Sequence, residues 1–188
     1  MRGMSELAER YRRIAAGFTR RVDAVPEGAW ENPAPCEGWQ ARDVVRHLVD
    51  WAPPMLLDNW DISRPEIPSV DDDPAAAWRA LNDAVQAAFD DPDVAKTERD
   101  TQMGTNSFEN VADMIFTGDV LVHTWDLARA TGQDEALDAD AVGRMFAGMQ
   151  GYEEAIRNSG HFGPAVPVPE DSDEQTKLIA FTGRNPLA

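Results

Sequence analysis

Apolar residues recur every three or four positions along almost the whole chain, whereas the strict alternation typical of β-strands is nearly absent. This spacing predicts amphipathic helices, each with an apolar stripe that needs a partner to cover it. Helices are expected over roughly residues 5–24, 74–90, 107–130 and 138–157, with one more beginning near residue 40 and a short one near 172–182. Five or six helices with short links in a chain of this size indicate an all-α fold, an antiparallel bundle.

Local signals mark some of the expected helix ends. Asp73 followed by Pro74 is typical of an N-cap and the first helical position. Pro53 and Pro54 fall within the second helix, and each lacks an amide hydrogen and clashes with the preceding turn, so a kink or a break is expected there. The long connection between the second and third helices would let these two run parallel.

The composition is typical of a globular protein with one domain. The chain has 188 residues, a usual length for a single domain, and 43% of them are hydrophobic against 27% charged. There are 34 acidic and 17 basic side chains, which give a formal net charge of −17 and a pI near 4.4. This charge repels phosphate backbones and anionic lipid headgroups, so we expect no nucleic-acid partner and no membrane-surface partner.

The single cysteine, Cys36, excludes an intramolecular disulfide and a Cys-x-x-Cys redox or metal motif. The first 18 residues carry charges throughout and contain no apolar segment typical of a signal peptide. No apolar run approaches the ~20 residues that a membrane-spanning helix needs. We therefore expect a single domain over residues 1–188, located in the cytoplasm.

Two of the three histidines are placed where they could meet. His47 lies on the apolar stripe of the second helix, where a buried imidazole needs a partner. His123 lies on the fourth helix with Asp119 one turn before it, so both side chains project from the same face. Two imidazoles and one carboxylate are typical of catalytic metal sites, which keep coordination positions open. The same spacing also suits a plain Asp–His hydrogen bond, so spacing alone leaves both interpretations open.

Three stretches of the chain carry a family resemblance. PCEGWQARDVVRHLVDW around the second helix, MGTNSFENVADMIFTGDVLVHTWDLARATG around the fourth, and FGPAVPVPEDSDEQTKLIAFTGRNP near the end follow one another in this order. The chain resembles the DinB-like metal-binding four-helix bundles. More closely, it is similar to the mycothiol-dependent maleylpyruvate isomerase N-terminal domain and its actinobacterial metal-binding relatives. The resemblance implies a DinB-like four-helix bundle with additional C-terminal helices.

The resemblance also implies a metal site. The family's ligands are a His in the HLV segment of the second helix and an acidic residue or a His four positions before a final His. In this sequence they fall on His47, Asp119 and His123. The implied cofactor is a divalent metal ion, zinc in the first place, with nickel, iron or manganese as alternatives because these ligand types suit all of them.

Two classes of function are compatible with such a site. The first is a metal-dependent enzyme that acts on a small-molecule substrate with a mycothiol-like low-molecular-weight thiol, for S-transfer or isomerisation of an electrophile; activation of water would instead give a hydrolase. The second is a non-catalytic metal- or ligand-binding bundle, a sensor or scavenger, which needs the same three ligands. No general acid or base stands out apart from the ligands. Four-helix relatives often dimerise, so a homodimer is an expected assembly.

Other residues are secondary candidates for the site. Asp50 and Asp126 each follow a proposed ligand by three residues and would orient an imidazole, although a solvated carboxylate is the expected state of both. Trp51 and Trp125 are candidates for substrate binding in a pocket, with core packing as the alternative. Arg184 is a candidate for binding a substrate carboxylate, with a structural clamp on helix ends as the alternative.

Two further residues carry less signal. Cys36 precedes the second helix, whose N-terminus would lower the pKa of a thiol, but a buried small apolar residue is its expected role. His161 lies in a segment rich in Gly and Pro and is expected at the surface.

Overall fold

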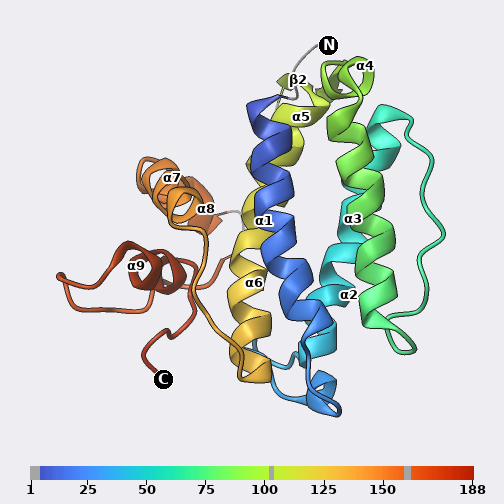
Figure 1. Ribbon diagram of the computed structural model, residues 1–188. Helices are drawn as coiled ribbons and strands as arrows, with labels where there is room; N and C mark the ends of the chain where they lie inside the picture. The colour runs from blue at the N-terminus through green and yellow to red at the C-terminus, as the bar shows by residue number, and fades with distance from the viewer. Residues whose placement is uncertain (1–4, 102–103, 159–161) are drawn as a thin grey trace.

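Four helices form a bundle in the computed structural model, which describes residues 5–101, 104–158 and 162–188 (Figure 1). They are α1 (Glu6–Asp23), α2 (Ala41–Ala52), α3 (Pro74–Asp90) and α6 (Gly118–Thr131). The start of α3 is as predicted, because the Asp73 side chain accepts a hydrogen bond from the amide of Ala76 and Pro74 occupies the first turn. These four helices confirm the expected all-α bundle.

One long connection decides how the helices are ordered in space. After the second helix, residues 61–73 return along the outside of the bundle, so that α3 begins at the same end as α2 (Figure 1). These two helices run parallel, as the length of the connection predicted, and α1 and α6 run in the opposite direction (Figure 1). Both α1 and α2 contact α3 and α6. This arrangement places α2 beside α6, the two helices that carry the predicted ligands.

The two prolines interrupt the second α-helix, as expected, although the chain stays helical in another form beyond them. α2 continues into a π-helical segment, η2 (Pro53–Leu57), and then into a 3₁₀ turn, η3 (Asp58–Trp60). Pro53 has φ −57° and ψ −52°. Because the φ that a proline ring imposes is itself helical, the backbone loses hydrogen bonds here while its dihedral angles stay helical. Another 3₁₀ turn, η1 (Ala29–Glu31), precedes α2.

The segment over residues 91–106, which lies between the third and fourth expected helices, contains regular structure. It holds a one-turn helix, α4 (Pro92–Ala95), and two strands, β1 (Glu98–Thr101) and β2 (Gly104–Ser107). The strands pair antiparallel, with Glu98 opposite Ser107 and Thr101 opposite Gly104. Apolar alternation does not reveal these strands, because most of their side chains are exposed.

The last third of the chain adds the expected C-terminal helices. The fourth predicted helix is divided into α5 (Phe108–Val111), the π-helical η4 (Ala112–Thr117) and α6. The fifth is two helices, α7 (Ala139–Gln150) and α8 (Glu153–Asn158), because the chain turns at Gly151 and Tyr152. α9 (Glu174–Phe181) packs against α7, which in turn contacts α6, on one side of the bundle (Figure 1).

Aromatic rings fill the centre of the bundle. Phe18 meets Trp78 edge-on with ring centroids 4.6 Å apart, and Tyr11 stacks on Phe89 at 5.0 Å. The polar ends of two of these buried rings are satisfied: the Tyr11 hydroxyl donates to Asn82, and the Trp78 indole N–H donates to a threonine hydroxyl. None of the described helices is both long enough and apolar enough to cross a membrane.

Candidate metal centre

The three predicted ligands meet inside the bundle. His47 projects from α2, and Asp119 and His123 project from successive turns of α6. The Nε2 atom of His47 lies 3.1 Å from Oδ2 of Asp119, and the Nε2 atom of His123 lies 3.3 Å from Oδ1 of the same carboxylate. One ligand atom from each residue lies within 4.8 Å of the other two. Side chains 72 residues apart in the sequence thus form one cluster of donors.

Trp51 holds the carboxylate at the centre of this cluster. Its indole N–H donates to Oδ2 of Asp119 over 3.0 Å, which leaves Oδ1 facing His123. The indole itself packs edge-on against Phe116 with ring centroids 5.6 Å apart. Trp51, predicted as a pocket residue, therefore also orients the central carboxylate.

The electrostatics of the cluster follow from its burial and its charges. Burial alone would raise the pKa of Asp119, but the neighbouring His123 and His47 outweigh it and hold this pKa well below its ordinary value. Burial would likewise lower the pKa of His123, but Asp119 outweighs it, with Asp126 adding to the effect, and raises this pKa to about 9. Without a metal, the cluster thus favours a carboxylate beside an imidazolium.

The far side of His123 is fixed by a second carboxylate. Asp126 is fully buried, and its Oδ2 lies 2.8 Å from Nδ1 of His123. Its Oδ1 and Oδ2 accept hydrogen bonds from Arg184, at 3.0 Å from Nε and 2.8 Å from Nη2. The expectation of a solvated Asp126 is therefore wrong, because the ion pair with Arg184 compensates its burial. Arg184 binds this carboxylate of the protein itself, although the sequence placed it as a candidate for a substrate's carboxylate.

The chemistry of the donor set fits a divalent cation. Burial raises the pKa of Asp126, but His123 and Arg184 outweigh it and lower this pKa, so Asp126 is an acceptor and His123 Nδ1 must donate to it. In the neutral ring, Nε2 then presents a lone pair to an oxygen of Asp119 3.3 Å away. Two acceptors at this distance need a cation between them, either a proton or a metal ion.

A second group, formed by Cys36, His123 and Asp126, also has metal-like spacing. The Arg184 guanidinium already supplies positive charge there, since its Nη2 lies 3.4 Å from the Cys36 sulfur as well as 2.8 Å from Asp126. Burial, with Asp126 adding to it, raises the pKa of Cys36 to about 12, in the direction opposite to the effect of a helix N-terminus. This group is therefore a poor metal site, and its thiol a poor nucleophile.

A hollow of about 410 Å³ adjoins the first group, and its lining includes His47, Trp51 and the exposed Asp50. Trp39, which the sequence analysis missed, forms another wall. Its ring stacks on His123 with centroids 5.8 Å apart and an interplanar angle of 18°. No periodic signal marks Trp39, because it lies in the loop before α2.

The buried Trp125 is not in the lining of this hollow. It packs under the Arg129 guanidinium, in agreement with the alternative of core packing. The third histidine, at position 161, lies outside the described residues.

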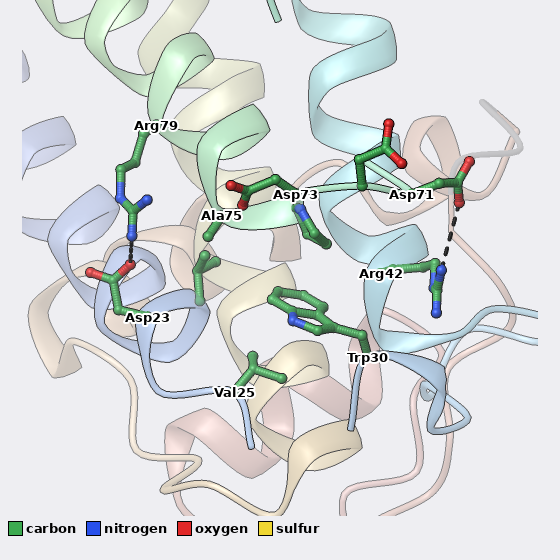
Figure 2. Close-up of a pocket in the computed structure, with 11 residues that line it drawn as sticks. Asp23, Val25, Trp30, Arg42, Asp71, Asp73, Ala75 and Arg79 are labelled. Carbon is green, nitrogen blue, oxygen red and sulfur yellow. Dashed lines mark hydrogen bonds and ion pairs between the residues drawn. The ribbon is translucent and has the colours of Figure 1, made fainter. Parts of the chain in front are cut away.

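Another hollow, of about 360 Å³, lies where α1 ends and α3 begins, and Figure 2 shows its lining. Trp30 lies between two ion pairs, one of Arg79 with Asp23 and one of Arg42 with Asp71 (Figure 2). Among the residues that the structure describes, the lining of this hollow includes no histidine or cysteine. The donors that suit a transition metal are thus grouped at the hollow beside His47.

Comparisons with known proteins identify relatives of this chain by sequence. No solved structure matches the chain significantly. Two uncharacterized proteins of Mycobacterium tuberculosis, from strains CDC 1551 / Oshkosh and ATCC 25618 / H37Rv, are each 31% identical over 158 residues, which cover 81% of this chain and 83% of the relative. The family model of the mycothiol maleylpyruvate isomerase N-terminal domain matches residues 11–58, a range that contains His47. The chain therefore belongs to the mycothiol maleylpyruvate isomerase N-terminal domain family, and these two mycobacterial proteins are its relatives by sequence.

Proposed function

We propose that this protein is a metal-dependent enzyme that uses a mycothiol-like low-molecular-weight thiol for S-transfer to, or isomerisation of, a small electrophile. The observation that carries the proposal is the convergence of His47, Asp119 and His123 within 4.8 Å beside a hollow of about 410 Å³. The name of the matched family supports the choice of thiol.

The residues have separate tasks in this proposal. His47 and His123 would hold a divalent ion through Nε2, and Asp119 would hold it through the oxygen that Trp51 does not bind. When bound, such an ion supplies Lewis acidity, which lowers the pKa of a coordinated thiol or water. Zinc is the first choice, and nickel, iron and manganese suit the same donors.

Access to the cluster favours an enzyme over a closed binding site. Three protein ligands leave coordination positions for a substrate. The His47 side chain is 33% exposed, and the hollow beside it has two indole walls, from Trp39 and Trp51, against which a small molecule can lose its contact with water.

The metal is tested first. The purified protein would be stripped with a chelator, loaded with zinc, dialysed and subjected to elemental analysis, alongside the double variant His47→Ala/His123→Ala. Because a protein with a net charge of −17 attracts cations non-specifically, the variant Asp72→Asn serves as a control that removes one exposed charge. We expect about one zinc per chain in the wild type and the control and none in the double variant. Equal zinc in all three proteins would refute the proposed site.

Turnover is tested next on zinc-loaded protein. Mycothiol would be offered with maleylpyruvate and with simple electrophiles such as epoxides and haloaromatics, and loss of free thiol and isomerised product would be measured. We expect turnover that disappears in the double variant. Full metal loading without any turnover would instead favour the non-catalytic binding protein, and hydrolysis of esters without thiol would favour the hydrolase.

A further inference from the structure

We infer that Asp126 and Arg184 form a positioning pair that fixes His123 as a metal ligand and makes the segment after α9 part of the metal site. The inference rests on the proposed metal site and adds to it two residues that are neither among its three proposed ligands nor in the lining of the hollow.

The first half of the pair is Asp126. It is fully buried one turn after His123 on α6, and it takes the Nδ1 hydrogen of that ring over 2.8 Å. This bond holds the ring in the tautomer whose Nε2 lone pair faces Asp119. A carboxylate on the outer nitrogen of a ligating histidine both orients the ring and makes it a better donor.

The second half is Arg184, which follows α9 in the chain and binds the Asp126 carboxylate. A buried carboxylate without a counter-charge is strongly destabilising, and the Arg184 fork supplies that charge through Nε and Nη2. Its side chain is only 12% exposed, and 58 residues separate it from Asp126.

Local structure leaves Arg184 little freedom. Gly183, with φ 90°, lies against the backbone of Gly163, where an added Cβ would come within 3.1 Å. The remaining hydrogen bonds of Arg184 go to the carbonyl of Thr182 and the sulfur of Cys36. A turn that only glycine fits therefore places the Arg184 guanidinium beside Asp126, on the Nδ1 side of His123.

The test uses the full chain and measures metal binding directly. Zinc affinity would be obtained by competition with a chromophoric chelator, and the ligand field from the visible absorption of the cobalt-loaded protein. Asp126→Asn keeps the shape of the side chain but removes the charge, and we expect about 10- to 100-fold weaker zinc binding and a changed cobalt spectrum. Arg184→Met should weaken zinc binding in the same direction, and Arg184→Lys should restore part of it, because a lysine keeps the charge but not the fork.

Controls separate this inference from the proposed function. Asp72→Asn, which removes an exposed charge at the other hollow, should leave affinity and spectrum unchanged. If His47→Ala abolishes zinc binding while Asp126→Asn and Arg184→Met both match the wild type, the positioning pair is refuted and the metal site stands. If the wild type binds no zinc, both fail. If circular dichroism shows that Asp126→Asn does not fold, the zinc affinities of the other proteins test the inference. Affinities that fall from the wild type to Arg184→Lys to Arg184→Met would support it, and equal affinities would overturn it.

Discussion

Raising the pH of the metal-free protein from 6.5 to about 9 is expected to lower its free energy of unfolding by about 3 kcal/mol. The perturbation acts on His123, whose imidazolium replaces the metal as the counter-charge of Asp119. A histidine with a raised pKa binds its proton more tightly in the folded state. The stabilisation is therefore complete below the unfolded pKa of 6.5 and is lost as the pH rises through about 9.

The magnitude follows from these two pKa values. A tenfold difference in proton affinity is worth ~1.4 kcal/mol, and the interval from 6.5 to about 9 gives about 3 kcal/mol for a ring that is only 4% exposed. The lowered pKa of Asp119 is the same attraction seen from the other partner, so it is not added. The raised pKa of Cys36 gives a smaller loss in the same direction, which begins near pH 9 where the unfolded thiol ionises.

The assay is urea unfolding at pH 6.5 and at pH 9, in the presence of a chelator, for the wild type and for Asp119→Asn. The variant keeps the Cys36 thiol and all the other titrating groups, so the difference between the two proteins isolates the ion pair. The free energy of unfolding should fall more between pH 6.5 and pH 9 in the wild type than in the variant, because only the wild type has this ion pair. An equal loss of stability in wild type and variant would refute the reasoning.

Further predictions concern the bundle itself, with urea unfolding followed by circular dichroism as the measurement. Phe18→Ala removes a fully buried ring from the core and should lower the free energy of unfolding by about 3–5 kcal/mol; a loss below 1 kcal/mol would contradict the packing. Asp73→Ala removes the N-cap of α3 and should cost about 1 kcal/mol, whereas Asp72→Ala next to it should cost less than about 0.5 kcal/mol. Gly132→Ala forces a side chain onto φ 70° at the end of α6 and should cost about 1 kcal/mol, whereas Gly148→Ala inside α7 should cost nothing or stabilise.

Much of the fold was predictable because its signals are local. The apolar stripes gave the four bundle helices, and the pair Asp73–Pro74 gave the start of α3. The hairpin was not predictable, since its four-residue strands are largely exposed and owe their order to pairing with each other. The interruption at Pro53 and Pro54 was predictable because each proline removes a backbone hydrogen bond, but the π-helical form that the chain takes there was not.

The candidate site likewise has residues that local sequence signals reveal and residues that depend on contacts distant in the sequence. The spacing of Asp119 and His123 on one helix and the place of His47 on the apolar stripe of another are local properties, and the family resemblance then implied that the three are metal ligands. The pairing of Asp126 with Arg184 depends on a turn 58 residues further on, so periodicity could not distinguish this buried carboxylate from a solvated one. Trp39 was missed because its stacking on His123 is set by the path of a loop.

The two π-helical segments have a consequence for how this sequence aligns with its relatives. A π turn holds one residue more than an α turn, so η2 and η4 act as single-residue insertions directly after Ala52 and directly before Gly118. Each residue advances an α-helix by about 100°, so a one-residue deletion there would rotate the helix beyond it while the Asp119–His123 spacing stays the same. A deletion in η2 would thus leave His47 in place, because His47 precedes it, whereas a deletion in η4 would turn the face of α6 that carries Asp119 and His123 away from α2.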